Sequence, residues 1–469
     1  MSRSFPFLSL LRRNRLPAML LVAVVFLVTV SCGRNLDERS EDGRIVLHYW
    51  EKWTGFEGDA MKAVVDDYNK SQDRVFVKMS TVSGIDRKLL VAVAGGDPPD
   101  IAGIWSWAVN IYSDKGAIMP ITERLAAVGI KRENYVPVFW DLCSHRGKTW
   151  ALPSTVATVA LHINRRLLRE AGIDPNYPPK TIAELNAMND TLTIYELSNG
   201  ERKSYNQLGG KPPADAKIIQ MGFLPFEPGW FDWAWGHWFH GQLWNGKDKI
   251  TSAHVGNVAA MKWYQYIMRR YGPDQIELFF NGFRGNFATS TNAFFCGKIA
   301  MVMQGVWMYN FIDKYSSGMD WAAAPIPSVD GEGPVTIVEC DVLAIPTGCR
   351  HPEEAFEFIR YVNSQAAMEK LAMGQRKFSP LVDVTPEFYA KHPNQYIKLF
   401  RQLAESPWTC STPASGIWNE YQRELNNVID QVRRLKIEPE AGLTDLQAQM
   451  QDKLDREIVR LKRRGMIEP

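Results

Sequence analysis

Residues 86–105 read DRKLLVAVAGGDPPDIAGIW, and this stretch indicates the fold class. Its first part, residues 86–94, has the apolar spacing of a helix, and the glycines and prolines of residues 95–99 end that helix. Residues 100–105 follow as a short apolar strand. A helix that stops at glycine and proline just before a buried strand is typical of a βαβ unit.

The segments on either side alternate between strand and helix in the same way. Met61, Val64 and Tyr68 recur at helical spacing, and Thr181 with Glu184 has the spacing of a capping box, which opens a helix. Alternating strands and helices predict an α/β fold with a mostly parallel sheet. The expected strands are 45–50, 75–79 and one ending at 162–164, and the expected helices are 57–69, 165–171 and 255–270, with a long loop or hairpin over 198–216.

The first 32 residues have the pattern of an export signal. A basic leader precedes an apolar run over residues 16–30, which is shorter than the roughly 20 residues that a spanning helix needs. The sequence TVSC at residues 29–32 resembles the lipobox of bacterial lipoproteins, in which the cysteine becomes the lipidated first residue. We therefore expect a signal peptide over 1–31, lipidation of Cys32 and a flexible tether over 32–43. An uncleaved anchor helix is the alternative.

Composition restricts the possible functions. The 469 residues include 54 basic and 52 acidic ones, so the net charge of +2 gives no electrostatic basis for binding nucleic acid. The sequence has no phosphate-binding glycine loop, so any energy source must lie on another chain. No metal or cofactor is expected, because the remaining cysteines lack metal-ligand spacing, although some could pair in an exported protein. They are Cys143, Cys296, Cys340, Cys349 and Cys410.

Several short motifs follow one another in an order that resembles a known family. They are WEKWTGFEG at 50–58, AVAGGDPPD at 92–100, GKTWALP at 147–153, the segments NR, AGI and PPKT within 164–181, FCGKIAM and GVW within 295–307, and PEEAFEFI at 352–359. Across almost all of the expected mature chain, the sequence resembles extracellular solute-binding protein family 1, the maltose-binding-like receptors of sugar importers. Two features depart from the family pattern: Glu339-Cys340-Asp341 replaces a common glycine pair, and residues 229–244 are unusually rich in tryptophan.

The resemblance implies a two-lobed periplasmic-binding-protein fold of type II, with a mostly parallel sheet flanked by helices in each lobe and the ligand in a cleft between them. Lobe one would comprise 44–155 plus 342–372, and lobe two 156–341 plus 373–469. An apolar stripe from Leu446 to Leu461, after a capping box at Thr444, would form a helix packed on lobe two. The protein would be an exported, lipid-anchored monomer of the cell envelope. It would bind a carbohydrate and deliver it to the permease subunits of an ATP-binding cassette importer, without catalysis.

A sugar presents apolar ring faces and a rim of hydroxyl groups, so its site needs flat aromatic rings together with hydrogen-bonding groups. The chain has 16 tryptophans, each of which could alternatively fill the core. Carboxylates near the return to lobe one could accept hydrogen bonds from hydroxyl groups. They could instead form a salt bridge between the lobes. The candidate ligand-binding residues are Trp50, Trp53, Trp105, Trp107, Trp233, Trp235, Trp307, Glu339, Asp341 and Arg376.

Three other functions fit parts of the sequence. A secreted glycoside hydrolase needs two carboxylates beside the scissile bond, and the chain has carboxylates in abundance. A metal receptor could use His237 and His240, which are three residues apart. A receptor of the same fold could bind a polyamine, with Glu339 and Asp341 beside aromatic rings, or a glycerol phosphate, for which basic residues are few.

Overall fold

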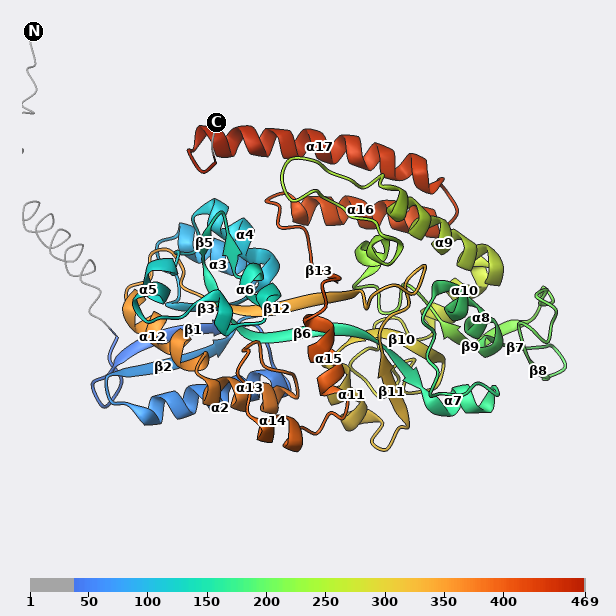
Figure 1. Ribbon diagram of the computed structural model, residues 1–469, viewed down its shortest axis with the longest axis horizontal. Coiled ribbons are helices and arrows are strands. Elements are labelled where there is room, and N and C mark those ends of the chain that lie inside the picture. Colours follow the sequence, from blue (N-terminus) through green and yellow to red (C-terminus); the bar gives the residue numbers. More distant parts are fainter. Residues whose placement is uncertain (1–37, 468–469) are drawn as a thin grey trace, which may run out of the picture.

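The structure is a computed structural model that describes residues 38–467. The predicted signal peptide, Cys32 and the first part of the predicted tether lie outside these residues. Figure 1 shows two lobes joined along the long axis of the molecule by strands β6 (Ala151–Asn164) and β12 (Thr336–Ala344). The predicted two-lobed α/β fold is therefore confirmed.

Lobe one is built on parallel strands that run directly into the crossing pair. Its elements are β1 (Ile45–Glu51), α2 (Gly55–Ser71), β2 (Val75–Thr81), α3 (Ile85–Ala94), β3 (Ile101–Trp105), α4 (Ser106–Lys115), α5 (Thr122–Ala127), η1 (Arg132–Asn134), α6 (Pro137–Leu142), β4 (Ser144–His145), β5 (Lys148–Thr149), α12 (Pro352–Val362) and α13 (Gln365–Gln375). The strand order is β2–β1–β3–β12, with β12 antiparallel to β3. The predicted end of α3 is confirmed, because Gly96 takes a φ of +74°, which favours glycine.

The two crossing strands connect the lobes through one continuous sheet. The first half of β6 pairs with β12, and its second half pairs with a strand of lobe two. All fourteen residues of β6 are buried, so the strand has no solvent-facing side. Apolar side chains therefore occur on both of its faces, although the strand also buries polar residues such as Thr158 and His162.

Lobe two has a mixed sheet. Its elements are α7 (Arg165–Glu170), α8 (Ile182–Leu192), β7 (Ile194–Glu196), β8 (Arg202–Ser204), β9 (Lys217–Phe223), η2 (Asp232–Phe239), α9 (Val255–Tyr271), α10 (Pro273–Asn281), β10 (Ile299–Gly305), α11 (Met308–Tyr315) and β11 (Trp321–Ala324). Among its described strands, only β9 and β10 pair in parallel, so this lobe is less parallel than expected. The predicted capping box is confirmed. Thr181 Oγ1 accepts a hydrogen bond from the Glu184 backbone N–H at 3.1 Å, and the Glu184 carboxylate accepts one from the Thr181 backbone N–H at 3.2 Å.

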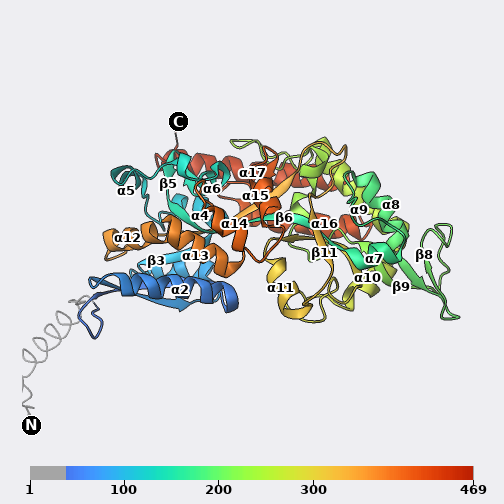
Figure 2. The ribbon, with the colours of Figure 1, turned by 60° about the horizontal axis from the view of Figure 1, so that its bottom comes forward.

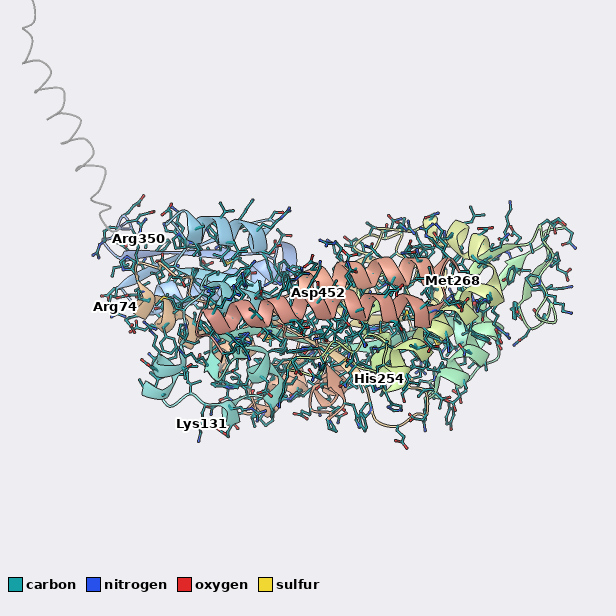
Figure 3. All side chains as sticks on the ribbon, turned by 90° about the horizontal axis from the view of Figure 1, so that it is seen from above. Arg74, Lys131, His254, Met268, Arg350 and Asp452 are labelled. Carbon is teal, nitrogen blue, oxygen red and sulfur yellow. The ribbon has the colours of Figure 1, made fainter. Side chains whose placement is uncertain are left out.

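The C-terminal segment covers both lobes. Its elements are α14 (Pro386–Lys391), α15 (Ile397–Ala404), β13 (Thr409–Cys410), α16 (Trp418–Arg433) and α17 (Pro439–Arg463). Figure 3 shows α17 lying lengthwise over the molecule, with Asp452 near its middle. Its start differs from the prediction, because Pro439 at the first helical position opens the helix and Thr444 lies inside it. Beyond its end, Arg464 donates to the Asp114 carbonyl of lobe one at 3.0 Å.

The packing of the apolar cores indicates to which lobe the C-terminal residues belong. Phe378, Ile397 and Phe400 belong to the same buried cluster as lobe-one residues such as Val109. Trp418 and later apolar residues up to Leu454 instead share the lobe-two cluster. This packing favours placing residues 373–404 with lobe one, and we keep the other predicted boundaries as a proposal.

In the part of the chain that the structure describes, no helix has both the length and the apolar character needed to cross a membrane. All five cysteines predicted to be available for pairing, which lie in this part, are free thiols.

Candidate functional site

A cavity of about 610 Å³ lies between the two lobes, beside the crossing strands. Lobe one, the crossing strands and lobe two all contribute to its walls. They include Trp53, Glu57, Trp105, Trp107, Thr155, Trp230, Phe231, Trp233, Phe287, Trp307, Phe311, Glu339, Asp341, Lys377, Ser411 and Thr412. Such a volume is within the range of small-molecule sites in proteins.

Three tryptophans form the wall on lobe one. Trp105, at the end of β3, stacks on Trp107 with ring centroids 5.7 Å apart and an angle of 15° between the planes. Trp53, in the turn after β1, meets Trp105 edge to face at 6.1 Å. The Trp53 indole donates to Asp341 Oδ2 at 2.7 Å, which fixes the ring beside the crossing strand. The strand ends thus hold flat apolar faces toward the cleft, as expected for an open α/β sheet.

A buried lysine supports this wall from behind. The side chain of Lys52 is only 3% exposed, and its ammonium lies 3.1 Å from Asp341 Oδ1 and 3.7 Å from Glu51 Oε1. It also lies 5.4 Å and 5.3 Å from the ring centroids of Trp53 and Trp105. Burial disfavours the charged form, but the two carboxylates outweigh it and raise the pKa of Lys52. Lys52 therefore remains charged and holds two tryptophans and two carboxylates together.

The wall on lobe two is also aromatic. Trp307 lies 6.4 Å from both Trp230 and Phe231, measured between ring centroids. Phe287 contacts Trp230 at 4.6 Å, whereas Trp233 is almost entirely buried and reaches the cavity at one edge. The lobe-two wall is thus a continuous aromatic surface.

Gly305 explains the spacing of the GVW motif at the end of β10. A Cβ atom at Gly305 would lie 2.3 Å from two ring carbons of Trp307, far inside van der Waals contact. Only glycine therefore allows the ring to lie flat against the strand. The Trp307 indole also donates to Gln304 Oε1 at 3.1 Å, which fixes the orientation of the ring.

Charged groups complete the cavity. Lys377 forms a buried ion pair with Glu57, and its ammonium lies 5.9 Å from the Trp307 ring centroid. Glu339 lines the cavity, and its side chain is exposed to the solvent of the cavity. Partial desolvation in the cleft, with Asp341 as a second cause, raises the pKa of Glu339 to about 7 even though Lys377 acts in the opposite direction.

The structure brings together seven of the ten candidate residues. Trp53, Trp105, Trp107, Trp233, Trp307, Glu339 and Asp341 all line the cavity. Trp50, Trp235 and Arg376 do not. Trp50 packs against the lobe-one core, because its position on β1 directs it there. Trp235 is fully buried and donates to the Pro225 carbonyl, whereas Arg376 pairs with Asp313.

Several lining residues were absent from the sequence-based candidates. Trp230 and Phe231 begin the tryptophan-rich segment that the sequence had indicated, so that signal was present. Lys377 directly follows a candidate, Arg376. No sequence pattern connects Phe287 and Phe311 to the site. Phe311, on α11, meets Phe56 of α2 at 5.7 Å, and Figure 2 shows these helix ends side by side.

The two histidines considered as metal ligands have separate surroundings. His240 pairs with Asp330 at 2.6 Å, whereas His237 packs edge-on against Trp233. Burial lowers the pKa of His237 to about 4. Among the described residues, no group of three or more His, Cys, Asp or Glu side chains could hold a metal ion.

Two curated proteins and one solved structure are similar to this chain over most of its length. An uncharacterised ABC transporter extracellular-binding protein of Pyrococcus horikoshii is 20% identical, over 91% of this chain and 95% of its own length. The maltotriose-binding protein of Pyrococcus abyssi is 19% identical, over 84% and 80%. A solved structure, CpMnBP1 with mannobiose bound, superposes with a TM-score of 0.72 and has 28% sequence identity. The match covers 86% of this chain and 98% of that chain.

A family description, bacterial extracellular solute-binding protein, matches residues 63–395, which is most of the chain. The match spans both lobes, the crossing strands and most of the cavity wall, although Trp53, Glu57, Ser411 and Thr412 lie outside it. The chain belongs to the bacterial extracellular solute-binding proteins.

Proposed function

We propose that the protein is a carbohydrate receptor that closes on its ligand between the two lobes and delivers it to the permease subunits of an ATP-binding cassette importer. The observation that carries this proposal is the cavity, which has aromatic walls on both lobes and carboxylates at the crossing strand. Ring faces of a sugar would lie against Trp53, Trp105 and Trp307. Hydroxyl groups would donate to Glu339 and Asp341.

The energetics of binding are consistent with a closed cleft. Micromolar affinity needs about −8.2 kcal/mol. Two or three stacked rings supply about 0.5–1.5 kcal/mol each in addition to the free energy of burying their apolar surface. Burial of apolar surface and paired hydrogen bonds must therefore supply the rest. Opposing aromatic walls provide that burial when hinge closure brings the lobes together. The names of two relatives, a maltotriose-binding protein and CpMnBP1 with mannobiose bound, support a sugar as the ligand.

A polyamine is the second candidate, because three carboxylates line the cavity against a single lysine. The same charge balance disfavours a glycerol phosphate, since Lys377 is already paired with Glu57. We further propose that the protein acts as a monomer and binds its ligand without converting it.

A thermal-shift screen of the purified protein tests the proposal. The screen compares mono- and oligosaccharides, polyamines and glycerol phosphates. A ligand that binds only the folded state raises stability by about 2.7 kcal/mol at 100 times its dissociation constant. We expect a sugar to stabilise the protein and to be recovered unchanged. Stabilisation by polyamines alone, or sugar breakdown, would contradict the proposal.

We also propose that the protein is exported and anchored to the cell envelope through lipid on Cys32. The TVSC sequence at residues 29–32 supports this anchor. Cys32→Ser should move the protein from the membrane fraction to the soluble fraction. If the variant stays in the membrane fraction, the anchor is not this cysteine.

A further inference from the structure

Glu339 is the unpaired charge of the cavity. It lies on β12 and projects into the space between the lobes. Among the described residues, no donor or cation forms a hydrogen bond or ion pair with its carboxylate. The neighbouring carboxylate of Asp341 is held by Trp53 and Lys52.

The charges around the cavity do not balance. Four carboxyl groups, on Glu51, Glu57, Glu339 and Asp341, face two ammonium groups, on Lys52 and Lys377, which leaves a net charge of −2 when Glu339 is ionised. Both lysines are already engaged, one with Glu57 and the other with Asp341 and Glu51. In the described part of the chain, Lys377 is the one basic residue that lines the cavity. The cation that acts on Glu339, Lys377, is thus already paired with Glu57, and Glu339 has no ion pair of its own among the described residues.

The surroundings of Glu339 favour a positive group from outside. Closing the cleft removes water from a carboxylate, and an unpaired buried charge is costly. A neutral hydroxyl group would give Glu339 a hydrogen bond but would leave the charge uncompensated. An ammonium group would neutralise it, and the aromatic faces of the same cavity also attract cations.

We propose that the ligand is a basic sugar, whose free amino group pairs as an ammonium ion with Glu339. This inference rests on the proposed function, since it names the class of carbohydrate. The flat indole faces, which line the cavity from both lobes, suit sugar rings better than the thin chain of a polyamine. The amino group supplies the missing charge, and the rings fill the aromatic walls.

Proton exchange gives the inference a distinct signature. The groups facing Glu339 are Asp341 on β12, Lys377 after α13 and its partner Glu57 on α2, while Lys52 compensates Asp341 from behind. With its pKa raised to about 7, Glu339 is partly protonated at neutral pH. Binding of an ammonium group favours the ionised carboxylate, so it should release protons. Affinity should consequently rise as the pH increases from 5.5 to 7.

The test is calorimetry with matched pairs of sugars, each a neutral sugar and its 2-amino counterpart. The pairs are glucose with glucosamine, mannose with mannosamine, and cellotriose with the corresponding β-1,4-linked glucosamine trimer. In the pair that binds, we expect the amino sugar to bind about 10- to 100-fold more tightly, as charged hydrogen bonds do. Titration in buffers of different ionisation enthalpy should reveal the proton release.

Glu339→Gln, which keeps the shape of the side chain, should abolish both the preference and the proton release. Glu387→Gln is the matched control, because Glu387 is exposed on α14. Equal or tighter binding of every neutral sugar would overturn the inference and leave the proposed function standing. Binding of spermidine but no sugar, or of neither, would overturn both.

Discussion

Replacement of Gly305 by alanine tests whether the Trp307 ring forms the sugar-binding surface. The new Cβ atom would lie 2.3 Å from ring carbons of Trp307, so the ring must move by about 1 Å or more to regain ordinary carbon contact. The three nearest atoms that this Cβ would meet all belong to Trp307, so the closest clash is with that ring. The displaced ring should lose its stacking on a ligand.

We expect Gly305→Ala to cost about 1–2 kcal/mol of binding, from lost stacking and part of the apolar burial. This corresponds to an affinity roughly five- to thirtyfold weaker in calorimetry with the sugar found by screening. Trp307→Ala should weaken binding at least as much. In the Trp307→Ala background the added methyl group meets no ring, so the double variant should match Trp307→Ala.

Two results would refute this reasoning. If the two substitutions have additive effects on affinity, Gly305 does not act through Trp307. If neither substitution changes affinity while denaturant unfolding reports folded proteins, the ring does not contact the ligand. A loss of stability in Trp307→Ala alone would instead identify the ring as a core residue.

Three further predictions concern stability. Trp235→Ala should lower the free energy of unfolding by about 3–5 kcal/mol in urea titration without changing sugar affinity; a selective loss of affinity would contradict its place in the core. Lys52→Met should cost about 3–5 kcal/mol, because it leaves two buried carboxylates without their cation, whereas Lys62→Met, at an exposed pair, should change little. An equal effect of the two substitutions would contradict the buried role. Burial lowers the pKa of His162 to about 3, so its contribution to stability is complete above pH 6.5. The free energy of unfolding should therefore fall by about 1.4 kcal/mol per pH unit as the pH drops below 6.5. His162→Phe should reduce this loss, measured by thermal unfolding at pH 5.5. An unchanged loss in the variant would contradict the role of His162.

The order of strands and helices was predictable because local patterns specify it. The apolar spacing of α2 and the glycine and proline stop after α3 each act within a few residues. The mixed pairing in lobe two was not predictable, since it depends on which strands β6 meets after crossing. Thr444 shows the limit of local signals: its capping-box spacing lies within a helix that Pro439 had already begun.

The site was predictable where tryptophans follow strand ends, as at Trp53 and Trp105. Within η2, the sequence could not distinguish Trp233 from Trp235, because both are large, buried rings and only the turn of the helix decides which reaches the cavity. At the end of α13, Arg376 has a φ of +56°, and this left-handed residue ends the helix. Arg376 then pairs with Asp313, whereas the next residue, Lys377, reaches the cavity, a change of direction that no sequence pattern specifies.

The most direct test of the central claim is a crystal structure of the protein with the sugar that stabilises it most. We predict electron density for an intact sugar between the Trp53–Trp105 wall and the Trp230–Trp307 wall, with a polar group of the sugar within hydrogen-bonding distance of Glu339. Density at another surface, or density for a cleaved product, would contradict the account of this protein as a receptor that binds a sugar between its lobes.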